Sequence, residues 1–373
     1  MILEEFASFV SQICAHTPLS AERPLLWTII ANPKAGGFTI KSRWKKHKRT
    51  LEECVQTAQK NPRYSQAGPS QTALREGKNE WGLIPTKALG HAKELCSALI
   101  NEAACAGKSK PFFLIITAGG DGTSLEVMTA LYHASAETRR NFAVLRLPMG
   151  TGNDGADDWD LGKALTLIID KPEIKMQRAV RLSTASGKGP FLAFNILSVG
   201  LDAFVTHMAN KMKSKLPGDS YKLWVDIAAL FYDRLYKVDF MDIRSRAGEG
   251  EEEELITFRE KLLLIAVGES GYRSYGSRKL VLPDSRNVCA IKQTSLFRKL
   301  VLKGYLSDGR HVNKAEALFW NSHSVEFTAR HPILAQMDGE TVLLDEMDYP
   351  AIIELTEPVI PVFRKINMIN QRG

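Results

Sequence analysis

The first half of the chain repeats one order of apolar and polar positions. An apolar run is followed by a glycine-rich turn, and a segment with helical apolar spacing comes next. Short continuous apolar runs are typical of buried strands, whereas apolar residues three and four positions apart indicate a helix. Strands that alternate with helices predict a mostly parallel sheet, whose ligands bind beyond the carboxyl ends of the strands. The runs that end in such turns are Leu25–Ala31, Phe112–Ala118 and Phe142–Leu147.

The pattern changes after Lys171-Pro172. Val180–Ala185 and Phe191–Ser198, joined by Ser186-Gly187-Lys188-Gly189, predict a hairpin. Helical spacing predicts a pair of helices at about Ala203–Lys213 and Tyr221–Tyr236. The other short apolar runs predict an antiparallel, strand-rich second domain, and they are Leu262–Val267, Val288–Ile291, Ser324–Thr328 and Ala351–Leu355.

These changes of pattern divide the 373 residues into parts, in line with the two or three domains that the length favours. Residues 1–24 predict a short amphipathic helix, which we treat as an N-terminal extension. An α/β domain over residues 25–171 and a β-rich domain over residues 172–356 follow. The compositions of Asn61–Trp81 and of the acidic run Gly248–Glu254 indicate surface insertions.

Composition excludes several classes of protein. Hydrophobic residues make up 44% of the chain and charged residues 24%, which excludes wholesale disorder. The five cysteines are scattered, which argues against a disulfide framework and favours a reducing compartment. No apolar run approaches the roughly 18 residues needed to span a bilayer. Glu4 and Glu5 stand where a signal peptide would carry positive charge. We therefore expect a cytoplasmic protein.

The formal net charge of +7 favours anionic partners such as phosphates or acidic lipids. Residues 41–49 contain six Lys and Arg residues, which on a helix could steer ATP or hold the protein peripherally at an anionic membrane. A solvated helix face explains the run equally well. Nucleic-acid binding is not indicated, because the basic stretches show no interleaved series of stacking aromatic residues. The oligomeric state leaves no signal, so a homodimer stays open.

Three glycine-rich turns carry the candidate chemistry. Gly119-Gly120-Asp121-Gly122-Thr123 joins a buried strand to a helix, where backbone N–H groups can cradle a phosphate. The acid among these glycines suits a site that also holds a metal, a hydroxyl or a ribose; the alternative is a tight turn with Asp121 as a helix cap. Gly150-Thr151-Gly152-Asn153-Asp154 and Asn32-Pro33-Lys34-Ala35-Gly36-Gly37 end the neighbouring predicted strands. All three turns should therefore face one crevice.

Together these motifs, in this order, resemble the catalytic domain of the diacylglycerol kinase family, which includes sphingosine and ceramide kinases. The resemblance continues through Ser198-Val199-Gly200-Leu201-Asp202-Ala203 and Met337-Asp338-Gly339-Glu340 and covers about residues 25–365. It implies a two-domain, ATP-dependent lipid kinase with the nucleotide in the cleft between the domains. It also implies that the last segment, residues 357–373, returns to the first domain.

The resemblance assigns roles to individual residues. Asn32, Pro33, Gly36 and Gly37 would approach the ATP phosphates, and Gly119, Gly120, Gly122 and Thr123 would hold the nucleotide together with Gly150, Thr151 and Asn153. Asp154 and Asp121 would bind Mg²⁺, and Asp338 and Glu340 would project towards the transferred phosphoryl group. A carboxylate near the lipid hydroxyl would accept its proton. Asp338 is the preferred base and Asp121 its rival; a simple turn between two strands is the alternative for Asp338-Gly339-Glu340.

The chain departs from the family's pattern in its second domain. It reads Val267-Gly268-Glu269-Ser270-Gly271 where the family has asparagine after Val-Gly, and Asp284-Ser285-Arg286-Asn287-Val288 where bacterial members support a structural Mg²⁺ site. In the first domain, Gly155 stands where the family usually has a bulky aromatic residue. These departures leave open a nucleotide- or lipid-binding module without turnover. A kinase for a soluble acceptor such as NAD also stays open, because NAD kinases share Gly-Gly-Asp-Gly-Thr.

Overall fold

The computed structural model describes residues 2–20, 24–60, 82–105, 111–170, 172–213, 232–247, 254–276 and 279–363. It divides into two compact units, one formed by Met1–Gln177 with Pro358–Gly373 and the other by Arg178–Glu357. The predicted insertion at Asn61–Trp81, the one at Gly248–Glu254 except for Glu254 itself, and most of the predicted helix at Tyr221–Tyr236 lie outside the described residues.

Unit 1 contains a six-stranded sheet in the order β2-β1-β3-β4-β19-β5. Strands β1, β2, β3, β4 and β19 pair in parallel, and β5 is an antiparallel edge strand. The strands are β1 (Leu25–Ala31), β2 (Leu83–Pro85), β3 (Phe112–Gly119), β4 (Phe142–Pro148), β5 (Ile174–Gln177) and β19 (Ile360–Phe363). All residues of β3 and β4 are buried, as their continuous apolar runs predict.

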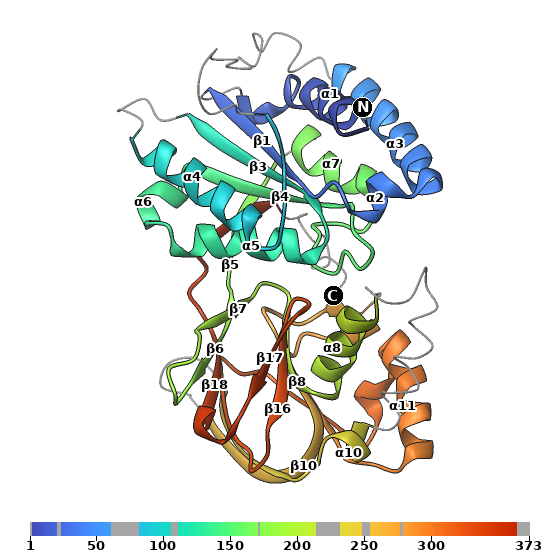
Figure 1. The fold of residues 1–373 in the computed structure, drawn as a ribbon, viewed down its shortest axis with the longest axis vertical. Helices are drawn as coiled ribbons and strands as arrows, with labels where there is room; N and C mark the ends of the chain where they lie inside the picture. Colours follow the sequence, from blue (N-terminus) through green and yellow to red (C-terminus); the bar gives the residue numbers. More distant parts are fainter. Residues whose placement is uncertain are drawn as a thin grey trace, which may run out of the picture. The chain divides into compact units, whose positions relative to one another are not determined.

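Helices cover both faces of this sheet (Figure 1). One face carries α1 (Ile2–Cys14), α2 (Gly36–Thr39), α3 (Lys41–Gln59) and α7 (Leu161–Ile169), and the other carries α4 (His91–Cys105), α5 (Asp121–His133) and α6 (Ala136–Arg139). The basic residues 41–49 form the first half of α3, where Lys48 pairs with Glu5 of α1 at 2.6 Å.

The first helix and the unit boundary differ from the sequence prediction. Phe6, Val10 and Ile13 of α1 are fully buried, and the Phe6 ring packs edge-on against Phe38 at 5.3 Å. The predicted extension is therefore part of the unit 1 core, because each such side chain gains about 1.5–3 kcal/mol from burial. The boundary falls after Gln177 rather than at Lys171-Pro172, because β5 adds to the unit 1 sheet beside β19.

Unit 2 is β-rich and its strand pairs are antiparallel. The strand β10 (Glu254–Gly268) organises it, because its first half pairs with β9 and its second half with β8 and β13. The other strands are β6 (Val180–Thr184), β7 (Phe191–Ala193), β8 (Ile196–Gly200), β9 (Phe240–Ala247), β11 (Arg273–Tyr275), β12 (Lys279–Leu282), β13 (Val288–Lys292), β14 (Ala317–Trp320), β15 (Ser324–Thr328), β16 (Ile333–Met337), β17 (Glu340–Leu344) and β18 (Ala351–Leu355).

Its described helices are α8 (Leu201–Lys213), α10 (Tyr232–Leu235) and α11 (Leu296–Asp308). The predicted hairpin is confirmed, since β6 pairs with β7 antiparallel. A parallel sheet with helices in one unit and an antiparallel sheet in the other confirm the predicted fold class.

Candidate active site

The three glycine-rich turns of unit 1 lie together at one edge of the sheet. They follow β1, β3 and β4, which are neighbouring parallel strands in register, with Ala31 opposite Ala118 and Gly119 opposite Pro148. The N–H of Asn32 donates to the Ala118 carbonyl at 2.9 Å. Gly37 in turn donates its N–H to the Met149 carbonyl at 2.8 Å. The three turns therefore lie together at the carboxyl ends of neighbouring strands, as the order of the elements predicts.

The second and third turns approach so closely that a side chain is excluded between them. A Cβ on Gly150 would lie 2.5 Å from the Cα of Gly120, a distance that no real side chain tolerates. Asn153 then shapes the turn from within. Its Oδ1 accepts the N–H of Gly150 at 2.7 Å, and its own backbone adopts a φ of 61°. Short polar residues such as asparagine tolerate this left-handed conformation best.

Asp121 belongs to the first turn of α5, and Gly120 rather than Asp121 occupies the N-cap position. Its Oδ1 accepts the N–H of Gly155 at 2.8 Å. Burial raises the pKa of Asp121, and hydrogen bonds from the Gly155, Asp154 and Asn153 backbone partly offset that effect. The alternative of a simple helix cap is therefore wrong: the carboxylate ties one glycine-rich turn to the next.

Asp121 and Asp154 face the same point in space. A Cβ on Gly152 would lie 2.8 Å from Oδ2 of Asp121 and 3.4 Å from Oδ2 of Asp154. Two carboxylate oxygens therefore lie close to the position where a side chain of residue 152 would begin. Mg²⁺ is usually held by one or two carboxylates together with phosphate oxygens and water, so this pair of residues fits a magnesium ion that a nucleotide helps to bind.

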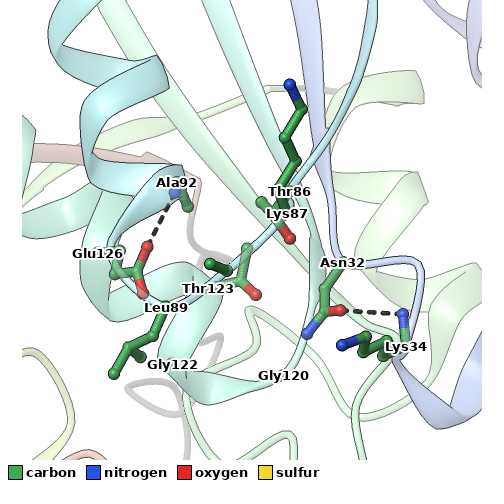
Figure 2. Close-up of a pocket in the computed structure, with 11 residues that line it drawn as sticks. Asn32, Lys34, Thr86, Lys87, Leu89, Ala92, Gly120, Gly122, Thr123 and Glu126 are labelled. Carbon is green, nitrogen blue, oxygen red and sulfur yellow. Dashed lines mark hydrogen bonds between the residues drawn. The ribbon is translucent and has the colours of Figure 1, made fainter.

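A cavity of about 260 Å³ opens beside the first two turns, entirely within unit 1 (Figure 2). Four predicted nucleotide-binding residues line it: Asn32, Gly120, Gly122 and Thr123. Lys34 and Lys87 also line it, so cations and the N-terminus of α5 border the same space. Both features favour a bound phosphate. Figure 2 shows the Asn32 carboxamide fixed by the backbone N–H of Lys34, which it accepts at 2.9 Å.

The cavity also contains residues that the sequence analysis missed. Thr86, Lys87, Ala88 and Leu89 follow β2, and Glu126 lies across from them on α5. The Glu126 carboxylate accepts the N–H groups of Gly90 at 2.8 Å and Ala92 at 2.9 Å, and so caps α4. β2 has only three residues, too few for a recognisable apolar run. The sequence did hold one signal for this loop: Gly90 stands directly before the apolar helical spacing of α4, which marks a turn between Thr86 and the helix.

The other predicted residues of unit 1 lie outside this cavity lining. Gly36 faces Arg43 and Thr151: a Cβ there would lie 2.8 Å from the Arg43 guanidinium and 3.7 Å from the Thr151 hydroxyl. One cation of the basic segment therefore lies at the glycine-rich turns. Gly37, Gly119 and Gly150 of this group pack within or between the turns, and Pro33 is likewise absent from the cavity lining.

Asp338 occupies a tight turn in unit 2. Met337 pairs with Glu340, and Asp338 and Gly339 between them have φ values of 46° and 102°. Positive φ at both central residues is the hairpin geometry of a type I′ turn. The buried Asp338 carboxylate accepts backbone N–H groups from the bend between β7 and β8, while Glu340 is exposed. The donors are Phe194, Asn195 and Ile196.

Unit 2 also contains an apolar pocket of about 110 Å³, lined from α8, α11 and the strands between them. Asp202, in the first turn of α8, is a polar group at this pocket, and burial raises its pKa. A chain of hydrogen bonds joins it to the Asp338 turn. Ser198 donates to Asp202 at 2.7 Å, Gln336 Nε2 donates to Ser198 at 2.9 Å, and Gly339 N–H donates to Gln336 Oε1 at 3.1 Å.

At the two places where unit 2 departs from the family's pattern, Glu269 and Asp284, a neighbouring arginine neutralises the carboxylate. The buried Glu269, which replaces the expected asparagine, pairs with Arg273 four residues later. Arg286 donates to both carboxylate oxygens of Asp284 and lowers its pKa. Within the described residues no cluster of three His, Cys, Asp or Glu side chains could hold a metal. The Asp284 segment therefore does not fit the structural Mg²⁺ site that the family resemblance implies.

Comparison with known proteins agrees with this geometry. Residues 26–183 match the family model "Diacylglycerol kinase catalytic domain". A protein named "Probable lipid kinase YegS-like" from Yersinia pestis (strain Pestoides F) is 26% identical over 237 residues, which cover 61% of this chain and 71% of that protein. Its namesake from Yersinia pseudotuberculosis serotype O:1b matches equally well. In the described residues no helix has the length and hydropathy of a membrane span.

Solved structures show the same fold. One from Bacillus anthracis str. Sterne superposes with a TM-score of 0.55 at 18% identity, over 91% of this chain and 98% of its own. Another, described as a diacylglycerol kinase from the same strain, gives a TM-score of 0.51 at 14% identity over 91% and 97%. With the turns, the cavity and the matching family model in agreement, we conclude that residues 26–183 resemble the catalytic domain of the diacylglycerol kinases, a family of phosphotransferases.

Proposed function

We propose that the chain is a lipid kinase that transfers the γ-phosphoryl group of MgATP to a lipid hydroxyl. The observation that carries the proposal is the convergence of three glycine-rich turns at one sheet edge, two of which border a cavity lined by Lys34 and Lys87. Phosphoryl transfer depends on positioning and charge neutralisation more than on covalent chemistry. Backbone N–H groups and lysines at one sheet edge supply both. The family implies ATP as the donor, and the curated relatives carry the name of lipid kinases.

Mg²⁺, when bound with the nucleotide, neutralises charge on the phosphates and orients them. Asp121 and Asp154 would hold it, since their Oδ2 atoms face the same space at Gly152. The hydrogen bond from Gly155 keeps the Asp121 carboxylate in place, and Asn153 keeps the turn that contains Asp154 in its shape. Both carboxylates are therefore oriented before the nucleotide arrives, which lowers the reorganisation that binding requires.

The acceptor would be bound by unit 2. Its pocket is lined mainly by aliphatic side chains, among them Leu201, Val205, Leu264 and Leu302, and such walls suit an acyl or sphingoid chain. Asp202 would orient a polar group of that lipid. A soluble acceptor such as NAD has far less apolar surface to match this lining, so the pocket favours the lipid.

Asp338 would accept the proton of the acceptor hydroxyl, with Glu340 beside it in sequence. Three backbone N–H groups fix the direction of the Asp338 carboxylate, and the hydrogen-bond chain through Gln336 and Ser198 joins its turn to the pocket that contains Asp202. A positioned carboxylate of this kind contributes about 10²–10⁴-fold to the rate as a general base.

The test is an assay with labelled ATP and Mg²⁺ on a mixed lipid extract, with mass identification of the phosphorylated product. We expect a phospholipid product, and a fall in kcat of about 100-fold or more for Asp338→Asn. Asp121→Asn should keep the fold, because its Oδ1 can still accept the Gly155 N–H, yet should require more Mg²⁺. Formation of NADP from NAD, or nucleotide binding with no lipid product, would contradict the proposal.

A further inference from the structure

Unit 2 contains a second cavity, of about 360 Å³, which shares no lining residue with the apolar pocket. Every residue that lines it belongs to unit 2. Its walls come from the segments that precede β6, follow β10, precede β13 and join β14 to β15, and from the end of β18. Leu355 is the one apolar side chain among the lining residues, so the cavity suits a small polar ligand rather than a lipid chain.

The buried part of this lining is preformed. The Asn287 carboxamide holds Ser322 at two points: its Nδ2 donates to the Ser322 carbonyl at 2.8 Å, and its Oδ1 accepts the Ser322 N–H at 2.9 Å. The Asn287 N–H donates to Oδ1 of Asn321 at 3.2 Å. Two segments of the wall are therefore fixed against each other without a ligand, and a preformed site loses less conformational entropy on binding.

The acids at the cavity are already neutralised. Glu269, the one acid in the lining, pairs with Arg273 and accepts the Ser270 hydroxyl at 3.3 Å. Asp284, next in sequence to a lining residue, pairs with Arg286. An anion in the cavity would therefore meet no unpaired carboxylate among the residues that line it.

Arg178 is the charged lining residue without such a pair. It is half-buried, and its guanidinium has no ion pair or hydrogen bond with the part of the chain that the structure describes. Its neighbour Arg181, by contrast, pairs with Glu354. The backbone beside Arg178 is fixed, because Ala179 donates its N–H to the Thr356 hydroxyl and accepts the Thr356 N–H, both at 2.9 Å. A guanidinium offers a planar fork of N–H donors that matches the oxygens of a phosphate.

Neutral donors of the same lining complement this cation. Ser285, Asn321 and His323 contribute a hydroxyl, a carboxamide and an imidazole. Since Oδ1 of Asn321 accepts the Asn287 N–H, the amide nitrogen of Asn321 remains as a donor. A phosphate group presents three acceptor oxygens and can use more of these donors than a carboxylate, which presents two.

We propose that this polar cavity of unit 2 binds a phosphate group, with Arg178 as its charged donor, at a site separate from the cavity of unit 1. The ligand chemistry is that of a phosphate dianion, supplied as inorganic phosphate or as the headgroup of a phosphatidic acid. The site needs no turnover, so it stands or falls independently of the proposed kinase activity.

The experiment is calorimetric titration of inorganic phosphate into the full chain carrying Lys34→Gln and Lys87→Gln, which removes the lysines of the unit 1 cavity. Both lysines are exposed, so these changes should keep the fold. We expect phosphate still to bind, and Arg178→Gln in this background to lose about ten-fold or more in affinity, because charge-assisted hydrogen bonds are lost. Arg178→Lys should recover only part of the affinity, since an ammonium cannot make the forked contact.

Arg330→Gln is the matched control, because Arg330 is an exposed cation of unit 2 outside the cavity lining. Phosphate affinity that is unchanged in Arg178→Gln, equally weakened in Arg330→Gln, or already lost with the two lysines of unit 1 would overturn the inference. The same titration with dihexanoyl phosphatidic acid identifies the source of the phosphate. Tighter binding of this lipid than of inorganic phosphate, dependent on Arg178, assigns the site to a lipid headgroup, and the reverse order assigns it to the free ion.

Discussion

Gln336 donates its amide N–H to the hydroxyl of Ser198 at 2.9 Å, and both side chains are fully buried. The Ser198 hydroxyl donates a hydrogen bond to Asp202, and Gln336 accepts the N–H of Gly339 in the Asp338 turn. One serine hydroxyl therefore connects the acid of the apolar pocket with the turn of the candidate base. Buried polar networks of this kind are rigid only when every member is satisfied.

Ser198→Ala should weaken catalysis more than nucleotide binding. Removal of the hydroxyl leaves Asp202 and Gln336 each without one hydrogen bond, at a cost of about 1–3 kcal/mol in the free energy of unfolding. The Asp338 turn loses part of its support, so kcat should fall about ten-fold or more while KM for ATP stays unchanged. Kinetics with both substrates varied, together with urea unfolding, measure these effects.

The control for this prediction is Ser245→Ala. Ser245 is equally buried in β9 of the same unit, donates to Ser322 at 2.8 Å and accepts from Trp320 at 2.7 Å. Its loss should lower stability to a similar extent without changing kcat. Equal losses of kcat in both variants would show that the Ser198 network has no special connection with the reaction.

A buried ion pair anchors the turn that contains Asp154. The Arg146 guanidinium donates to Asp157 at 2.6 Å and to Gln177 at 3.2 Å, and the two charged side chains are 7% and 1% exposed. Asp157→Ala leaves a buried guanidinium with one partner fewer, which should cost about 3–5 kcal/mol. Thermal unfolding should show a clearly lower Tm for this variant.

The double variant Arg146→Met with Asp157→Leu tests whether the loss of stability in Asp157→Ala comes from the unpaired charge of Arg146. Replacing both charges by apolar side chains removes the unpaired charge, so the double variant should be more stable than Asp157→Ala. A double variant that is less stable than Asp157→Ala would mean that the pair contributes more than the cost of burying its charges.

The sequence predicts the convergence of the glycine-rich turns because parallel strands end at one edge, and this relation does not depend on side-chain detail. The carboxylate of Asp121 is different. The sequence predicts that Asp121 lies near the start of a helix. The hydrogen bond that its carboxylate accepts from Gly155 depends on how two turns pack, with Gly150 against Gly120. Contacts between turns leave no periodic signal, so they were not predictable from the pattern.

The acceptor pocket was hidden for a related reason. Its lining runs from Leu201 to Leu306, on two helices and several strands, and each lining residue looks like ordinary core in the sequence. The backbone donors to Asp338 come from Phe194, Asn195 and Ile196, more than a hundred positions away along the chain. The motif Asp338-Gly339-Glu340 predicts a turn, but its partners are set by the tertiary fold.

Nucleotide-free protein should be indifferent to removal of Mg²⁺. Arg286 occupies both oxygens of Asp284, so this segment has no carboxylate ready for a structural ion. We expect the same Tm in EDTA and in Mg²⁺ when ATP is absent. With ATP present, Mg²⁺ should raise the Tm, because a ligand that binds only the folded state stabilises it. A lower Tm in EDTA without ATP would reveal a metal site in the folded protein.

His311 should make the stability of unit 2 depend on pH. The imidazole is fully buried, its Nε2 lies 3.1 Å from the Val281 carbonyl, and burial lowers its pKa from the usual 6.5. The unfolded chain therefore binds a proton first as the pH falls. Stability is complete above about pH 6.5 and is lost as the pH falls from there towards the lower pKa of the folded state, by up to about 1.4 kcal/mol per pH unit.

His311→Gln removes this titration while keeping an N–H that can reach the Val281 carbonyl. Urea unfolding at about pH 7.5 and about pH 5.5 should show a smaller loss of stability for the variant than for the wild type. Other titrating groups are the same in both proteins, so the difference between the two losses reports His311 alone. If both proteins lose the same amount, the folded protein must accept the proton as readily as the unfolded chain does, and burial of the ring cannot be lowering its pKa.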